Sequence, residues 1–248
     1  MLLNAEDAPA LPLWINGRAF LTMAPSFLDV VGGPDGQVLR KIPLCGADEV
    51  ETAVSGARLA LGAWNGSDGE TRRGCLTQLG ESLGRYRDHF AKLLGEETGR
   101  DGADCAAEVD RALALLARIE PRDAAPQVAG LLYDHQAPLL APLVLSAQVL
   151  ADGGVAVLKP STKAPSCGVA LAELWTRAGL PDGVCNLVQG DEAAVLALAA
   201  HPGVDRLALA GAAGWREKVK QRLGAKPAFE AEADEVLGAA WAGALAGN

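Results

Sequence analysis

One segment of the chain combines an apolar run with side chains that can bind an anion. It reads Val155-Ala156-Val157-Leu158-Lys159-Pro160-Ser161-Thr162. The lysine ammonium and the hydroxyls of Ser161 and Thr162 can donate hydrogen bonds to the ribose or phosphate of a nucleotide, and such ligands bind where parallel strands end. A lysine after a strand is also common as a solvated turn residue, so the segment alone leaves both interpretations open.

A second segment, Ala210-Gly211-Ala212-Ala213-Gly214-Trp215, joins an expected strand to an expected helix. Because Gly211 and Gly214 have no side chains, a phosphate could approach the backbone N–H groups at the helix start. The spacing differs from the Gly-x-Gly-x-x-Gly of dinucleotide-binding turns. An ordinary strand-to-helix turn explains the two glycines equally well.

The cysteines do not form a disulfide or metal-binding pattern. They are Cys45, Cys75, Cys105, Cys167 and Cys185. Their number is odd, no Cys-x-x-Cys pair occurs, and only three histidines are available to join them. We therefore expect no disulfide framework and no metal site. Cys75 and Cys105 fall on or beside apolar helix stripes and are interpreted as small core residues rather than reactive thiols.

Composition argues against several classes of function. Of 248 residues 50% are hydrophobic, and 22 lysines and arginines face 31 acidic residues, which gives a net charge of −9. This balance argues against a nucleic-acid or anionic-membrane partner. No segment reaches the roughly 18 apolar residues of a membrane span, and the N-terminus lacks the basic and apolar regions of a targeting signal. We expect a soluble cytoplasmic protein.

Hydrophobic periodicity predicts the elements of the first half. Apolar runs broken by the turn signals Asn16-Gly17 and Pro34-Asp35-Gly36 predict arm strands within about 12–44. Apolar residues at steps of three and four predict three amphipathic helices within about 47–119, of which the second carries Leu76 to Leu93. The first should begin at an N-cap formed by Asp48, with Glu51 as its capping-box partner.

Beyond Pro121 and Pro126 the pattern alternates between strand and helix. Strands rich in valine and leucine that alternate with helices predict an α/β fold, a Rossmann-like parallel sheet within about 127–247 with helices on both faces. We expect residues 1–248 to form one domain. The predicted strands are Val128–Tyr133, Val155–Leu158, Val184–Val188, Arg206–Ala210 and Pro227–Glu230, and the predicted helices are Leu139–Ala151, Ser166–Ala178, Glu192–Ala200 and Trp215–Leu223.

Four motifs together resemble the first half of an aldehyde dehydrogenase, in a match that runs nearly end to end. Leu13-Trp14-Ile15-Asn16-Gly17 resembles the opening strand of that family, and Glu97-Thr98-Gly99-Arg100 its Glu-Thr-Gly-Lys turn. Leu158-Lys159-Pro160-Ser161 resembles its nucleotide-binding turn. The most specific motif is Ala178-Gly179-Leu180-Pro181-Asp182-Gly183-Val184-Cys185-Asn186, which is similar to its Ala-Gly-Leu-Pro-x-Gly-Val-x-Asn segment.

The resemblance implies NAD(P)-dependent oxidation of an aldehyde to an acid by a nucleophilic cysteine, an oxyanion-binding Asn and a general-base Glu. Gln136 takes the place of that Asn, and Arg222 takes the place of the Glu. A guanidinium cannot accept a proton from water, although Glu230 or Glu232 nearby could substitute as a base. The chain ends at Asn248, before the motif of the nucleophile. We therefore predict no catalytic residue and a protein that is inactive on its own.

The resemblance also implies a site for NAD or NADP at Lys159, Ser161, Thr162, Gly211 and Gly214. Thr162 stands where the family has an acidic residue that chelates the ribose hydroxyls, so binding need not favour NAD. The two glycines lie closer together than in the family and the serine of that turn is missing. These departures argue against tight binding of either cofactor.

Assembly should also differ from that of the family. Only residues 120–127 stand where the family has a long excursion in its oligomerisation sheet, so the arm strands near Leu13 and Phe27 should present unpaired edges. We predict a truncated, non-catalytic domain that assembles with a full-length aldehyde dehydrogenase, or with itself through the arm strands. The alternative is the NAD(P)-binding half of an aldehyde oxidoreductase whose catalytic half is on another chain. A nucleotide sensor and an unselected gene fragment also stay open.

Overall fold

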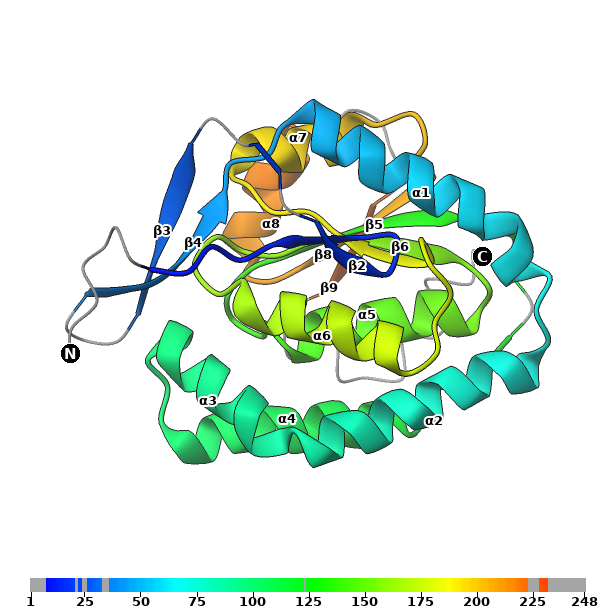
Figure 1. The fold of residues 1–248 in the computed structure, drawn as a ribbon, viewed down its shortest axis with the longest axis horizontal. Helices are drawn as coiled ribbons and strands as arrows, with labels where there is room; N and C mark the ends of the chain where they lie inside the picture. The colour runs from blue at the N-terminus through cyan, green and yellow to red at the C-terminus, as the bar shows by residue number, and fades with distance from the viewer. Residues whose placement is uncertain are drawn as a thin grey trace.

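The computed structural model describes residues 8–20, 22–23, 26–32, 36–122, 124–222 and, as backbone, 228–231. A seven-stranded sheet with a separate two-stranded hairpin lies among the helices (Figure 1). The strands are β1 (Leu13–Ile15), β2 (Arg18–Phe20), β3 (Phe27–Gly32), β4 (Gln37–Pro43), β5 (Val128–Tyr133), β6 (Val155–Lys159), β7 (Cys185–Leu187), β8 (Arg206–Ala210) and β9 (Ala228–Ala231). The helices are α1 (Ala47–Asn65), α2 (Gly69–Arg85), α3 (Arg87–Thr98), α4 (Gly102–Leu116), α5 (Leu140–Ala151), α6 (Ser166–Arg177), α7 (Glu192–Ala200) and α8 (Ala213–Lys220).

The order of the large sheet is β2-β1-β7-β6-β5-β8-β9. Strands β5 to β9 are parallel, and β1 joins them through an antiparallel pairing with β7. Because β6 and β7 lie on one side of β5 while β8 and β9 lie on the other, the strand order reverses between β5 and β8. In doubly wound sheets the crevice at such a reversal is where ligands bind.

Helices cover both faces of this sheet, which confirms the predicted α/β architecture. Helices α1 and α7 pack over one face and α5 and α6 over the other, and α2, α3 and α4 form an outer layer against α5 and α6 (Figure 1). Every residue of β5 and β6 is buried, as expected for parallel strands covered on both sides. These two strands therefore form the buried centre of the sheet.

The helical half differs from the prediction in two ways. The single helix expected to carry Leu76 to Leu93 is two helices, α2 and α3, because the backbone of Tyr86 (φ −100°, ψ 17°) leaves the helical region. The first helix has its N-cap at Gly46 rather than Asp48. The carboxylate of Glu49 accepts a hydrogen bond from the Gly46 backbone N–H at 3.0 Å. This is one half of a capping box, two residues earlier than expected, and glycine has no side chain to supply the other half.

The arm strands form as predicted, but β1 is not an unpaired edge. Asn16 and Gly17 both have positive φ (52° and 72°), which suits a tight hairpin between β1 and β2. The other side of β1 meets β7, where Trp14 pairs with Leu187. The expected open edge at Leu13 is therefore wrong, since β1 extends the large sheet. The other turn signal, Pro34-Asp35, lies outside the described residues.

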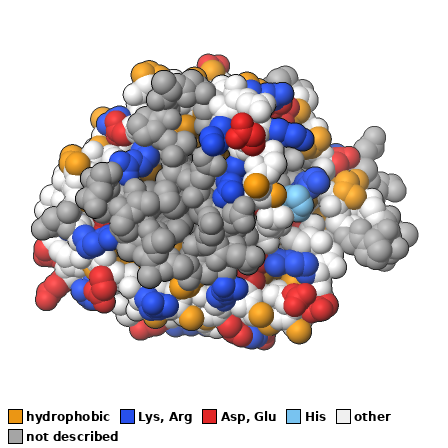
Figure 2. All heavy atoms as spheres, turned by 180° about the vertical axis from the view of Figure 1, so that it is seen from behind, with side chains coloured by type: hydrophobic (Ala, Val, Ile, Leu, Met, Phe, Trp, Pro, Cys, Tyr) orange, Lys and Arg blue, Asp and Glu red, His pale blue; other side chains and the backbone are white. Residues whose placement is uncertain are grey.

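On the face seen in Figure 2, the described surface has no large patch of side chains of one charge sign. There, lysines and arginines lie among aspartates and glutamates around the rim, with small apolar side chains between them. No helix in the described ranges is both long and apolar enough to cross a bilayer. The larger exposed apolar side chains include Phe27, Leu28 and Val31, all on β3.

Candidate functional site

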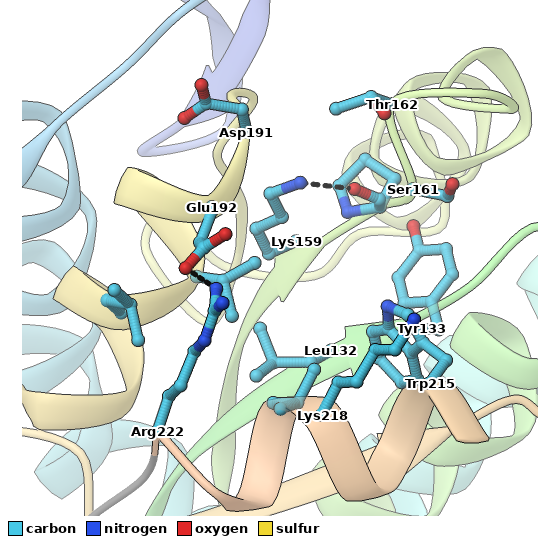
Figure 3. A pocket seen from close by; sticks show the side chains of 14 residues that line it. Leu132, Tyr133, Lys159, Ser161, Thr162, Asp191, Glu192, Trp215, Lys218 and Arg222 are labelled. Atoms are coloured by element: carbon cyan, nitrogen blue, oxygen red, sulfur yellow. Dashed lines mark hydrogen bonds and ion pairs between the residues drawn. The ribbon is translucent and has the colours of Figure 1, made fainter. Parts of the chain in front are cut away.

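A cleft of about 350 Å³ opens at the carboxyl ends of β5 and β6, between α7 and α8 (Figure 3). Three of the five predicted cofactor residues, Lys159, Ser161 and Thr162, line it. Trp215 and Lys218 line it from α8. The structure therefore brings the Lys-Pro-Ser-Thr turn to a hollow of the size that small ligands use. Whether these residues bind a cofactor stays a prediction.

Lys159 is the most unusual side chain of the cleft. It is only 4% exposed, and its Nζ donates one hydrogen bond, of 2.7 Å, to the carbonyl oxygen of Pro160. Burial lowers the pKa of Lys159 to about 8, while the nearby Asp191 and Cys45 act in the opposite direction. An ammonium has three donors, so this one can still donate to oxygen atoms of a ligand.

The turn after Lys159 is held at its far end by Glu97. This buried carboxylate accepts hydrogen bonds from the backbone N–H of Ser166, at 3.0 Å, and from its hydroxyl, and Arg40 lies 3.6 Å away. Burial raises the pKa of Glu97, and the Ser166 and Arg40 contacts oppose that rise. Glu97 thus fixes the start of α6 and, through it, the turn that carries Ser161. The motif that contains Glu97 is recognisable in the sequence, but this role of Glu97 is not.

The turn after β8 is held by Asp134, which is not among the predicted site residues. Its carboxylate accepts hydrogen bonds from the backbone N–H of Ala212 at 2.7 Å and of Gln136 at 2.8 Å. Gly211 has a φ of 147°, and a Cβ at this position would lie 2.3 Å from Cγ of Asp134. Close approach to Asp134 is therefore the structural reason for a glycine here. Gly214 lies in the first turn of α8, so its expected place in the preceding loop is wrong.

We expect Gly211→Ala to lower the free energy of unfolding by about 1–3 kcal/mol, because the backbone strain and the clash with Asp134 act together. Gly74→Ala is the matched control, since a Cβ there meets nothing within 4 Å inside α2. That control should raise stability slightly, because alanine favours a helix over glycine. Denaturant unfolding measures both, and a Gly211→Ala variant as stable as the wild type would contradict the assigned role of Asp134.

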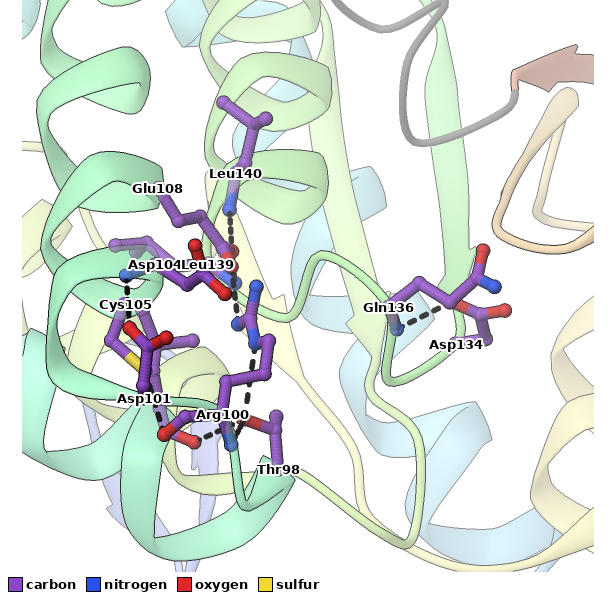
Figure 4. A network of polar contacts seen from close by, with 11 residues as sticks. Thr98, Arg100, Asp101, Asp104, Cys105, Glu108, Asp134, Gln136, Leu139 and Leu140 are labelled. Carbon is purple, nitrogen blue, oxygen red and sulfur yellow. Dashed lines mark hydrogen bonds and ion pairs between the residues drawn. The ribbon is translucent and has the colours of Figure 1, made fainter.

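The structure places Arg222 in the lining of the cleft and Gln136 outside it. Gln136 is exposed in the turn after β5, where its backbone N–H bonds to Asp134 (Figure 4). Arg222 lines the cleft and is ion-paired with Glu192 of α7. A paired guanidinium is a fixed cation rather than a base. The side chain of Glu230 and all of Glu232 lie outside the described residues.

All five cysteine thiols are buried and free of disulfides. The pKa of every thiol is raised, and burial is the largest cause in each case. The pKa of Cys45 rises to about 12, because the nearby Glu49 carboxylate adds to the effect of burial. A thiol acts as a nucleophile only as the thiolate. The interpretation of Cys75 and Cys105 as core residues is confirmed. Among the described residues, no three His, Cys, Asp or Glu side chains cluster in a way that could hold a metal ion.

Comparison with known proteins places this geometry in a family. Residues 22–120 and 127–233 match the model of the aldehyde dehydrogenase family. A methylmalonate-semialdehyde/malonate-semialdehyde dehydrogenase of Caenorhabditis elegans is 25% identical over 84% of this chain and 44% of its own length. An N-succinylglutamate 5-semialdehyde dehydrogenase of Burkholderia mallei is 30% identical over 73% of this chain and 41% of its own length.

Solved structures agree. A methylmalonate-semialdehyde dehydrogenase from Sinorhizobium meliloti in complex with NAD, at 22% identity, shares the fold with a TM-score of 0.83 over 89% of this chain and 50% of its own. Aldehyde dehydrogenase C of Pseudomonas syringae, in complex with NAD⁺ and octanal, is 26% identical with a TM-score of 0.80 over 90% and 50%. The chain spans about half the length of these relatives. It belongs to the aldehyde dehydrogenase family.

Proposed function

We propose that this domain does not oxidise aldehydes by itself and acts as a structural or regulatory partner of a complete aldehyde dehydrogenase. The observation that carries the proposal is that the described residues hold no exposed thiol, while a paired arginine stands at the general-base position. Loss of a nucleophile in comparable enzymes lowers turnover by roughly 10⁴–10⁶-fold. A domain of this fold whose described residues hold no exposed thiol is better suited to assembly than to covalent catalysis.

Co-expression with a complete aldehyde dehydrogenase of the same organism tests the partner role. We expect the two chains to elute together in size-exclusion chromatography and the specific activity of the complete enzyme to change in the complex. Exposed apolar residues of β3, such as Phe27 and Val31, support a contact surface there. The variant Val31→Asp should weaken co-elution while Leu59→Asp, at a still more exposed apolar position on α1, should not. A monodisperse monomer that joins none of the complete enzymes would refute the proposal.

We expect the native protein to react slowly with a thiol reagent such as Ellman's reagent at neutral pH. Burial keeps the five thiols protonated and out of contact with the reagent. In guanidinium chloride all five should react at the rate of a free thiol. One cysteine that reacts within seconds in the native state would be a candidate nucleophile and would contradict the proposal.

The cleft supports a second candidate, an NAD(P)-binding domain whose chemistry is completed by another chain. Lys159 is the observation in its favour, because a buried ammonium with a single carbonyl acceptor suits a ribose or phosphate oxygen. Ser161 and Thr162 would add hydroxyl donors from the same turn. A bound NAD(P)⁺ would supply a hydride acceptor, and these residues would only hold it. Calorimetric titration with both cofactors tests the candidate, and no heat at millimolar concentration would end it.

A further inference from the structure

Asp134 closes the crevice at which the strand order reverses. It follows directly on β5, and its carboxylate bonds at 2.7 Å to the backbone N–H of Ala212, the N-cap residue of α8. Its own N–H donates to the carbonyl oxygen of Ala210 at the end of β8. Asp134 is 6% exposed and Gly211 is buried against it, so the closure is part of the core.

This closure conflicts with the binding of a dinucleotide. In doubly wound folds the pyrophosphate lies at the helix start beside the reversal of strand order, where free N–H groups attract its charge. Here an internal carboxylate already accepts the N–H of Ala212 and places a negative charge where the pyrophosphate would lie. Like charges a few ångströms apart repel strongly in a buried setting. The residues present therefore do not fit a pyrophosphate at this terminus.

Carboxylates of this chain also accept hydrogen bonds from backbone N–H groups at the N-termini of other helices along this edge of the sheet. Glu97 accepts from the N–H of Ser166 at the start of α6, and Asp191 accepts from the N–H of Ala193 in α7. Glu108 accepts from the N–H groups of Leu139 and Leu140 at the start of α5. A ligand phosphate must therefore find side-chain donors rather than a helix terminus.

The cleft between α7 and α8 supplies such donors. Lys159 and Lys218 line it, and Arg222 offsets the charge of Glu192. Ser161 and Thr162 add hydroxyl donors from the turn after β6. The buried hydroxyl of Tyr133 is not one of these donors, because it lies against Gly168 of α6 on the other face of the sheet.

Apolar side chains complete the cleft. Val195 and Leu196 of α7 face Trp215 and Val219 of α8 across it. An aromatic base can pack against an indole ring and aliphatic side chains, as in other nucleotide sites. The cleft thus offers one apolar compartment and one cationic, hydroxyl-rich compartment, while the route to a second nucleotide is closed at Asp134.

We propose that this cleft binds a nucleoside monophosphate and not a dinucleotide. The inference rests on the second candidate function, since it names the ligand of the same cleft, and it leaves the partner role untouched. Calorimetric titration of the full chain with AMP, NAD⁺, NADP⁺ and inorganic phosphate tests it. We expect AMP to bind at least as tightly as either dinucleotide and much more tightly than phosphate.

Two other outcomes would overturn the inference. A dinucleotide that binds about a hundredfold more tightly than AMP would overturn the inference alone, because the cleft would still be a nucleotide site. Binding of none of the four would end both the inference and the second candidate function. Either result is read from the wild-type protein and needs no variant to fold.

The variant Asp134→Asn tests whether the negative charge of Asp134 weakens the binding of a dinucleotide. Its amide oxygen can still accept the N–H of Ala212, whereas the negative charge is gone. We expect NAD⁺ to bind about tenfold more tightly to this variant while AMP binding is unchanged. Asp88→Asn removes one charge from the exposed surface of α3 and should change neither affinity. An Asp134→Asn protein that gains nothing for NAD⁺ would overturn the proposed role of the carboxylate.

Discussion

Replacing Glu108 by alanine is expected to lower the free energy of unfolding by about 3–5 kcal/mol, because it would leave a buried network without its acceptor. The Glu108 carboxylate accepts hydrogen bonds of 3.0 Å from the N–H groups of Leu139 and Leu140 and one of 2.5 Å from Arg100 (Figure 4). Its side chain is 6% exposed. Three donors would lose their partner at once.

Denaturant unfolding of three variants checks this expectation. Glu108→Gln should lose less stability than Glu108→Ala, since the amide oxygen still accepts from the helix start. Glu173→Ala breaks the exposed pair between Glu173 and Arg177 within α6 and should leave stability close to that of the wild type. If Glu108→Ala unfolds at the same denaturant concentration as Glu173→Ala, Glu108 does not hold the start of α5.

The variant Lys159→Met is expected to gain stability and lose nucleotide binding. Burial lowers the pKa of Lys159 from 10.5 to about 8, so at neutral pH the folded protein keeps a charge that its surroundings disfavour. Methionine has a similar length and no charge, and its introduction should raise the free energy of unfolding by up to about 3 kcal/mol. Lost binding with gained stability is typical of a functional residue in a strained setting.

The lowered pKa of Lys159 makes the difference in stability between the wild type and Lys159→Met depend on pH. Because the folded pKa of Lys159 lies below the unfolded value, the unfolded state binds more protons between about pH 8 and pH 10.5, and wild-type stability should rise across that range relative to Lys159→Met. The difference between the two proteins should be complete below pH 8 and vanish above pH 10.5. AMP affinity should fall as the pH passes about 8. A constant difference in stability across this range would contradict the assignment.

Strong local patterns made much of the sheet predictable from the sequence. The bounds of β5 and β8 match the prediction, because continuous apolar runs ended by turn residues leave a buried strand few alternatives. The break at Tyr86 was missed, since the apolar spacing continues through it. The N-cap at Gly46 was missed because the signal lies in the carboxylate of Glu49 rather than in the capping residue itself.

The candidate site was predictable only where its residues are neighbours in sequence. Lys159, Ser161 and Thr162 share one turn and reach the cleft together. The roles of Glu97 and Asp134 were not predictable, because each carboxylate accepts from a distant backbone N–H group, 69 and 78 residues away, which leaves no trace in side-chain spacing. Buried carboxylates of this kind become visible only once helix starts are placed in space.

One measurement tests most directly the central claim that this domain lacks aldehyde-oxidising chemistry. The purified full chain, at a concentration comparable to that of the reagents, is mixed with an aldehyde and NAD⁺ or NADP⁺, and reduced cofactor is recorded in the first turnover. We expect no reduced cofactor above a control without protein, and no acylated cysteine by mass spectrometry. A burst of about one equivalent of reduced cofactor per chain, with one acylated cysteine, would contradict it.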